Sequence, residues 1–246
     1  MKFRYLKPAS ALPRTALLSV TFSALILFNL SGQKVLRQNQ PLRIMTIGDS
    51  NGALPEGWVT QLRKLRSNDS IFNVSVSGNT IGFNNNGRRS LNTLANIASY
   101  IEKGYSSLGR IDIILLMIGT NDCKAVYRDS TAIVTGNMRK LIDMIRSESK
   151  THKGEPAVYI ITPPPYGPDE LVGEKYAGGL ARVTWLNKQL SLIASEKGTG
   201  FIDTFDILLP VFRFLSQDGV HLNPDGQMII ARVINENLKY FHGVRK

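Results

Sequence analysis

The sequence predicts an α/β fold of three layers, α/β/α, with a central five-stranded and mostly parallel sheet. Apolar runs of strand length alternate along the chain with longer segments whose apolar residues recur at helical spacing. The run over residues 113–118 is apolar throughout, which is typical of a strand buried on both faces of a parallel sheet. Such alternation indicates parallel strands with helices on both faces. No linker suggests a second domain, so we expect a single domain over residues 42–242.

The individual elements are predicted in order from the same pattern. Strands are expected over residues 43–47, 71–76, 112–118, 157–162 and 201–203. Helices are expected over residues 58–65, 91–101, 133–145, 183–194 and 224–238. The prolines at 163–165 end the fourth strand, because proline has no N–H for a sheet ladder.

The N-terminal segment differs in kind from the rest of the chain. Residues 1–32 hold four basic and no acidic residues, and an apolar run over residues 16–30 is followed by small residues. This order is typical of a signal peptide, and the run is short for a full membrane span. We therefore expect residues 1–32 to be a signal peptide or an uncleaved N-terminal membrane anchor rather than a buried helix. The protein is then exported, whether periplasmic, secreted or membrane-anchored outside the cytoplasm.

Charge and cysteine content limit the possible functions. After residue 32, 26 Lys and Arg stand against 19 Asp and Glu, and the basic residues are dispersed. No basic stripe with interleaved aromatic residues occurs, so no nucleic-acid partner is expected. The positive excess is compatible with acidic glycans or other polyanions, and equally with an ordinary solvated surface. The single cysteine, Cys123, excludes an internal disulfide and has no basic partner other than Lys124 to activate it.

Polar motifs follow the predicted strands. Gly-Asp-Ser at 48–50 comes after the first strand, Ser-Gly-Asn-Thr at 77–80 after the second, and Gly-Thr-Asn-Asp at 119–122 after the third. Asp-x-x-His at 218–221 comes after the fifth. Ligands of an open parallel sheet bind beyond the carboxyl ends of its strands, so all four motifs are expected at one edge.

The four motifs resemble, in order and in kind, the blocks of the SGNH hydrolases, also called the GDSL esterase/lipase superfamily. The resemblance runs over residues 42–238 and implies the SGNH/flavodoxin-like fold. It implies that Ser50 is the nucleophile, His221 the general base and Asp218 the carboxylate that orients the base. A serine hydroxyl needs such a base, because it is a weak nucleophile until its proton is taken.

The resemblance also implies an oxyanion hole. Its donors are the backbone N–H groups of Ser50 and Gly78 and the side-chain amide of Asn121, which together would stabilise the negative oxygen of the tetrahedral intermediate. Glycine at 78 allows a close approach of the backbone to the substrate. We expect no cofactor and no metal.

The sequence indicates the substrate less clearly than it indicates the reaction. Asn51 follows Gly-Asp-Ser where the superfamily's nickname has Leu, which weakens the case for a long-chain lipase. The first strand and the 119–122 motif look most like carbohydrate-directed, acetylxylan-esterase-like members. The expected function is therefore a serine esterase that hydrolyses O-acyl esters, foremost O-acetyl esters of a glycan, through an acyl-enzyme on Ser50. A general short-chain esterase or thioesterase, and a glycan O-acetyltransferase, are the alternatives.

Other classes of protein share parts of the pattern. The loop over residues 47–52 could cradle a phosphate in a flavodoxin-like binding protein, and a non-catalytic glycan-binding relative would keep the fold alone. A metal-dependent hydrolase could use four side chains without any recognisable ligand spacing: Asp49, Asp122, Asp218 and His221. Structural roles, such as a helix N-cap for Ser50, also stay open.

Several further residues are expected to be structural. Asp49 and Asp122 are expected to tie down loops by accepting backbone hydrogen bonds. Trp58 and Trp185 are expected in the core, because both have apolar neighbours at helical spacing. Two polar, glycine-rich segments are expected to form the rims of the cleft and to select the substrate: residues 82–89 and 166–179.

Overall fold

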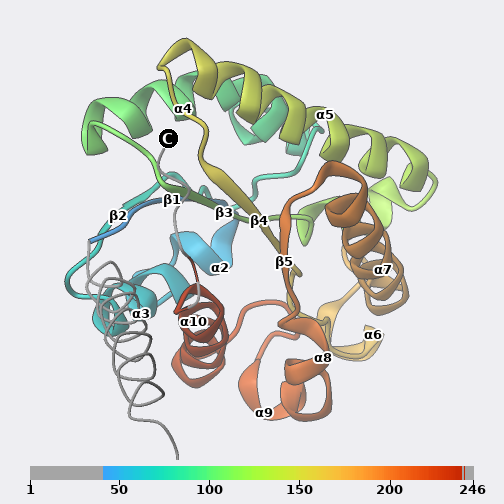
Figure 1. Ribbon diagram of the computed structural model, residues 1–246. Helices are drawn as coiled ribbons and strands as arrows, with labels where there is room; N and C mark the ends of the chain where they lie inside the picture. Colours follow the sequence, from blue (N-terminus) through green and yellow to red (C-terminus); the bar gives the residue numbers. More distant parts are fainter. Residues whose placement is uncertain (1–40, 240, 242–246) are drawn as a thin grey trace, which may run out of the picture. The chain divides into compact units, whose positions relative to one another are not determined.

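The computed structural model describes residues 41–239 and 241, and a parallel β-sheet lies at their centre (Figure 1). The strand order is β2-β1-β3-β4-β5, and all four strand pairs are parallel. The bounds are Arg43–Gly48 for β1, Ser70–Asn73 for β2, Ile113–Met117 for β3, Ala157–Ile161 for β4 and Gly200–Ile202 for β5. The predicted fold class is confirmed, and the sheet is parallel throughout.

Helices cover both faces of this sheet. One face packs against α4 (Thr93–Leu108), α5 (Thr131–Thr151) and α7 (Gly179–Lys197). The other face packs against α3 (Trp58–Leu65) and α10 (Pro224–Leu238), with short helices beside them. The short helices are α2 (Ser50–Ala53), α6 (Asp169–Val172), α8 (Phe205–Leu208) and α9 (Phe212–Leu215). Five 3-10 turns complete the elements: η1 (Asn85–Gly87), η2 (Arg89–Leu91), η3 (Asn121–Cys123), η4 (Ala125–Tyr127) and η5 (Leu209–Val211).

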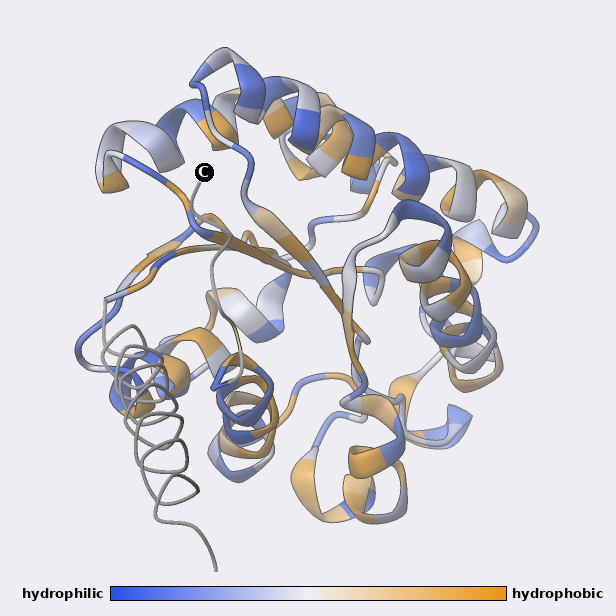
Figure 2. Cartoon of the chain, in the orientation of Figure 1, coloured by the Kyte–Doolittle hydropathy of each residue, from blue (hydrophilic) through white to orange (hydrophobic). Residues whose placement is uncertain are grey.

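Side-chain alternation along the strands builds two cores, one on each face of the sheet. Within β3, Ile114 and Leu116 belong to the core under α4, α5 and α7, whereas Ile113 and Leu115 belong to the core under α3 and α10. All four are fully buried, which explains why the strand is a continuous apolar run in the sequence. Figure 2 shows the hydrophobic residues concentrated along the central strands.

One of the two expected core tryptophans is not in the core. Trp58 is fully buried under the sheet, as predicted, but Trp185 is 37% exposed. The buried stripe of α7 is carried by residues three and four positions apart, such as Val183, Leu186 and Leu190. Trp185 lies outside this stripe, so the prediction for it was wrong.

The topology places the motifs at one edge of the sheet. In the order 2-1-3-4-5, the strand connections reverse direction between β1 and β3, and a crevice opens there at the carboxyl ends. The 48–50 motif ends β1, and the 119–122 motif follows β3 directly. The fold therefore brings the predicted nucleophile and the predicted amide donor to the same crevice.

The N-terminal prediction lies outside this part of the chain. The signal peptide or membrane anchor expected for residues 1–32 falls on residues that the structure does not describe. Among residues 41–239 and 241, no helix is both long and apolar enough to span a membrane.

Candidate active site

Ser50 lies at the sharp turn from β1 into α2, at the bottom of a cavity. The turn is capped by Asp49, whose Oδ1 accepts a hydrogen bond from the backbone N–H of Asn51 at 3.1 Å. Ser50 is the first residue inside the helix and does not cap it, so the N-cap interpretation of this serine is wrong. Its hydroxyl is left to interact with His221.

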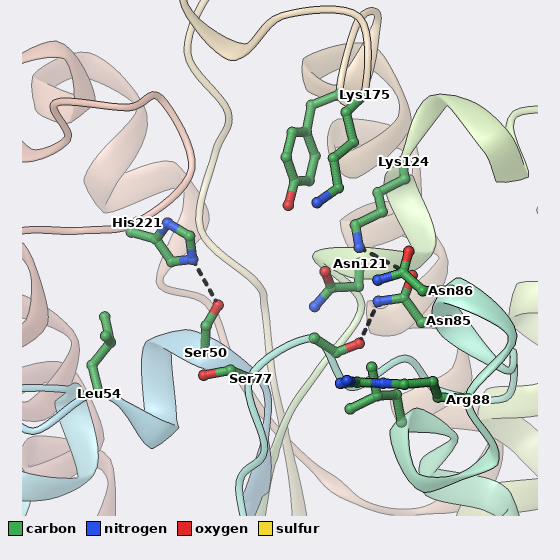
Figure 3. A pocket seen from close by; sticks show the side chains of 13 residues that line it. Ser50, Leu54, Ser77, Asn85, Asn86, Arg88, Asn121, Lys124, Lys175 and His221 are labelled. Atoms are coloured by element: carbon green, nitrogen blue, oxygen red, sulfur yellow. Dashed lines mark hydrogen bonds between the residues drawn. The ribbon is translucent and has the colours of Figure 1, made fainter.

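A line of hydrogen bonds runs from Ser50 to Asp218. The distance from Ser50 Oγ to His221 Nε2 is 3.0 Å (Figure 3). The distance from His221 Nδ1 to Asp218 Oδ2 is 2.6 Å. Ser50 and His221 are 171 positions apart in the chain. The structure therefore brings together the three side chains that the sequence assigned to nucleophile, base and orienting carboxylate.

The loop around Asp218 fixes its carboxylate. The Oδ1 atom accepts hydrogen bonds from the backbone N–H groups of Val220 at 2.9 Å and His221 at 2.7 Å, which leaves Oδ2 facing the imidazole. Partial burial acts to raise the pKa of Asp218. The hydrogen bonds from the His221 ring and from the two backbone groups outweigh burial and hold the pKa below its ordinary value. Asp218 is therefore ionised at neutral pH.

Hydrogen-bond donors gather beside Ser50. Among the described residues, the backbone N–H groups of Ser50 and Gly78 have no hydrogen-bond acceptor. The Asn121 Nδ2 atom donates to the carbonyl of Asn79 at 2.9 Å, which orients the amide and leaves its second N–H unused. Ser50, Gly78 and Asn121 all line the same cavity. Three predicted oxyanion donors thus share one space with the serine.

The backbone at Gly78 requires glycine. Its φ of +89° lies in a region that other residues rarely adopt, and an added Cβ would come within 3.2 Å of Leu91 Cδ1. The Gly78 carbonyl also accepts a hydrogen bond from Asn85 Nδ2 at 2.6 Å. Glycine therefore permits this backbone conformation, and the hydrogen bond from Asn85 stabilises it.

Asp49 and Asp122 bind backbone groups below the cavity, as expected. Both carboxylate oxygens of Asp122 accept from the N–H of Ile81, at 3.0 and 2.9 Å. Burial, together with the nearby charge of Asp49, raises the pKa of Asp122 to about 7. Among the described residues, no three His, Cys, Asp or Glu side chains are grouped so that they could hold a metal ion.

Asn51 has a structural role that the sequence did not reveal. It is fully buried and does not line the cavity. Its Oδ1 accepts hydrogen bonds from the N–H of Leu222 at 3.2 Å and from Gln227 Nε2 at 2.9 Å. Asn51 therefore joins the Ser50 turn to the His221 loop and α10. Its departure from Leu is therefore explained by these contacts inside the protein.

The rims of the cavity come from the two predicted segments. The cavity has a volume of about 500 Å³, and residues 82–89 contribute Asn85, Asn86 and Arg88 to its wall. Residues 166–179 contribute Lys175 and Tyr176. The prediction of these rims is confirmed.

Lys124 also lines the cavity, and sequence reasoning considered it only as a partner of Cys123. Burial raises the pKa of the Cys123 thiol well above its ordinary range, so this cysteine is unreactive. The signal for Lys124 was its place in the chain, because it directly follows the 3-10 turn that begins at Asn121, a residue of the same cavity.

A serine, an imidazole and a carboxylate in hydrogen-bonded series, with free N–H groups beside the serine, are what a serine-dependent acyl hydrolase requires. The model of the GDSL-like lipase/acylhydrolase family matches residues 45–229. The chain belongs to this family, as its motifs predicted, and it is a carboxylic ester hydrolase.

Solved structures with the same fold are distant in sequence. The chain is similar to Est24, described as a carbohydrate acetylesterase from Sinorhizobium meliloti, with 19% identity, a TM-score of 0.64 and coverage of 79% of this chain and 97% of that one. It is similar to the native aryl esterase of M. smegmatis, with 19% identity, a TM-score of 0.66 and coverage of 80% and 98%. A lipase/acylhydrolase from Enterococcus faecalis has 20% identity, a TM-score of 0.61 and coverage of 83% and 100%. No curated protein matches the chain in a sequence search.

Proposed function

We propose that this hydrolase removes O-acyl groups, foremost O-acetyl groups, from carbohydrate through an acyl-enzyme on Ser50. The observation that carries the proposal is the hydrogen-bonded line from Asp218 through His221 to Ser50, which opens on a cavity with unpaired N–H donors. Export, expected from residues 1–32, is part of the same proposal and would bring the enzyme into contact with extracellular or cell-wall glycans.

The reaction follows from the positions of the atoms. His221 Nε2 takes the proton of Ser50 as Oγ attacks the ester carbonyl, and Asp218 stabilises the imidazolium that forms. The carbonyl oxygen becomes negative and is stabilised by the free N–H donors beside Ser50. His221 then returns the proton to the leaving alcohol, and the C–O bond to that alcohol breaks. Water, deprotonated by His221, attacks the acyl-enzyme in the second half, which releases the acid and restores the Ser50 hydroxyl.

The lining of the cavity supports a short acyl group. Leu54 and Leu91 are the aliphatic side chains among its lining residues, and the rest of the wall is polar, charged or glycine, with the tyrosine Tyr176. Each methylene of a long acyl chain gains about 0.8 kcal/mol only where it is buried against apolar surface. An acetyl group needs little such surface, and the polar wall suits sugar hydroxyls. The similarity to a carbohydrate acetylesterase agrees with this choice of substrate.

Acetate release from defined substrates tests the proposal. The panel contains acetylated xylan, acetylated pectin, acetylated peptidoglycan and p-nitrophenyl esters of increasing chain length, with Ser50→Ala as the inactive control. Release of acetate from a glycan by the wild type, and none by Ser50→Ala, supports the proposal.

Two other outcomes identify the alternatives. Activity on the p-nitrophenyl esters alone indicates a general short-chain esterase and contradicts the choice of a glycan. Transfer of the acetyl group to an added sugar in place of water indicates an O-acetyltransferase.

A further inference from the structure

One wall of the cavity is positively charged. Three cationic side chains line it and are here called the cationic wall: Arg88, Lys124 and Lys175. In Figure 3 they lie on the side of Ser50 that is opposite to His221. The lining residues of this cavity include no aspartate or glutamate, and none of the three cations forms an ion pair with another described residue. The wall is therefore a local excess of positive charge next to the reacting serine.

Lys124 is the buried member of the wall. Only 3% of this residue is exposed, and its Nζ has one hydrogen-bond acceptor, Asn85 Oδ1 at 3.1 Å. An ammonium group has three N–H donors, so two remain without a hydrogen-bond acceptor among the described residues, and the Tyr176 ring is its other contact. Burial of a charge is costly where its hydrogen-bond donors stay unpaired, and an anionic ligand bound to these donors would lower that cost. The free donors of Lys124 therefore indicate a ligand with negative charge.

Lys175 adds a second positive charge close by. The Nζ atoms of Lys124 and Lys175 lie 5.7 and 5.2 Å from the centre of the Tyr176 ring. Burial, and then the charge of Lys175, lower the pKa of Lys124 to about 8, against the opposite effects of Asp122 and Asp49. Two like charges beside one ring repel each other, and an anion bound between them removes the repulsion.

The cavity continues beyond the cationic wall. A second cavity of about 730 Å³ shares Lys124, Lys175, Asn85 and Asn86 with the first. Its lining contains Tyr127 and one acidic side chain, Glu174. The two cavities meet at Lys124 and Lys175, and asparagine and tyrosine side chains, such as Asn84, Asn86 and Tyr127, lie among their lining residues. Two cavities joined in this way fit more than one sugar unit of a polymer.

We propose that the cationic wall binds a carboxylate of the substrate, and that the substrate is an O-acylated acidic glycan, in which uronic acid units stand next to the acylated sugar. This inference rests on the proposed function and names the class of glycan. Lys124 and Lys175 supply the charge, and Arg88 supplies a planar group that can bind a carboxylate through two parallel hydrogen bonds.

A matched pair of polymers tests the inference. One is O-acetylated polygalacturonate with free carboxylates, and the other is the same acetylated polymer with its carboxylates converted to methyl esters. The wild type is expected to release acetate from the acidic polymer with a kcat/KM about tenfold or more above that of the neutral polymer, since a hydrogen bond between charged groups contributes about 1.5–3 kcal/mol. The preference is expected to fall as NaCl concentration rises, because salt screens exposed charges.

Variants assign the preference to the wall. Lys124→Met is expected to reduce the ratio of the two kcat/KM values by about tenfold. Lys175→Gln, at an exposed position, is expected to reduce it by at most about fivefold, because exposed ion pairs contribute less. The ratio is the readout because Lys124 also contacts Asn85, and a general loss of rate cancels in it. Lys103→Gln, on the exposed surface of α4, is the control and should not change the ratio.

The outcomes separate the two proposals. Equal rates on both polymers, or a preference that survives in Lys124→Met and Lys175→Gln, overturn the inference and leave the proposed function standing. Release from neither polymer, with p-nitrophenyl acetate still hydrolysed, overturns the acidic glycan. Acetate release from acetylated xylan or acetylated peptidoglycan then decides whether the proposed function stands. If Lys124→Met does not fold, Lys175→Gln and Arg88→Gln, both at exposed positions, decide the result.

Discussion

The carboxylate of Asp218 offers a sharp test of how the imidazole is oriented. In an Asp218→Asn variant, an amide replaces the carboxylate. An NH₂ group then takes the place of either Oδ1 or Oδ2. The backbone N–H groups of Val220 and His221 donate to the Oδ1 position, at 2.9 and 2.7 Å, so this position must hold an oxygen, which can accept both hydrogen bonds. The NH₂ group is therefore forced to face His221 Nδ1, which makes Nδ1 an acceptor and moves the ring proton to Nε2.

The size of the effect follows from these contacts. With a proton on Nε2, His221 cannot take the proton of Ser50. Turning the amide around would set an NH₂ group against two N–H donors and lose both hydrogen bonds, at a cost of about 3 kcal/mol, so that less than about 1% of molecules would be competent. The loss of the negative charge beside the imidazolium adds to this. We expect kcat to fall by about 10³–10⁴, as for the equivalent change in serine proteases.

The assay is the initial rate of p-nitrophenyl acetate hydrolysis at saturating substrate, with thermal unfolding to establish that the variant is folded. Ser216→Ala is the matched control, because it removes only the longest hydrogen bond to the same carboxylate, at 3.3 Å from Ser216 Oγ to Asp218 Oδ1. This control should change kcat by less than about fivefold. A folded Asp218→Asn enzyme that keeps more than a tenth of wild-type kcat would show that Asp218 does not set the tautomer of His221.

Three further predictions concern the donors, the scaffold and the charge of the site. Asn121→Ala removes one donor to the developing oxyanion and should lower kcat by about 10²–10³ with little change in KM; an unchanged kcat would remove Asn121 from the oxyanion hole. Asn51→Ala leaves the N–H of Leu222 without an acceptor and removes the shorter of the two hydrogen bonds that Gln227 Nε2 donates, so the free energy of unfolding should fall by about 2–4 kcal/mol, measured by urea denaturation. Lys124 is positively charged below its pKa of about 8 and neutral above it, so the preference for the acidic polymer should decline as pH rises through 8. A preference that stays constant from pH 7 to 9.5 would contradict that assignment.

The fold was predictable because its strands are short apolar runs with polar motifs at their carboxyl ends. The run at 113–118 could be identified as a doubly buried strand from composition alone, and β3 occupies it. The ends of elements were less accurate. The second strand was expected to reach residue 76 and ends at Asn73, whose side chain accepts hydrogen bonds from Thr46 Oγ1 and from the N–H of Ser75. Backbone hydrogen bonds to β1 nevertheless continue past Asn73, from the N–H of Val74 to Thr46 O and from the N–H of Val76 to Gly48 O, so the expected and the observed strand differ only in where the regular strand ends.

The site was predictable only in part, for physical reasons. No spacing rule relates Ser50 to His221 across 171 positions, so their pairing came from the resemblance and from the shared edge of the sheet. Asn51 and Lys124 were missed or misinterpreted because a sequence does not say which way a side chain turns. Asn51 directly follows the 48–50 motif, yet it is buried and does not line the cavity. Lys124 lies two positions after the 119–122 motif and does line the cavity.

The central claim is that Ser50 becomes covalently acylated while His221 activates it. Treatment with a serine-directed phosphonate, followed by intact and peptide mass spectrometry, tests this directly. We predict one adduct per molecule, located on the peptide that contains Ser50, with loss of esterase activity in proportion to labelling. A folded His221→Ala variant should remain unlabelled over the same time. Labelling at another residue, or full activity with Ser50 modified, would show that Ser50 is not the nucleophile.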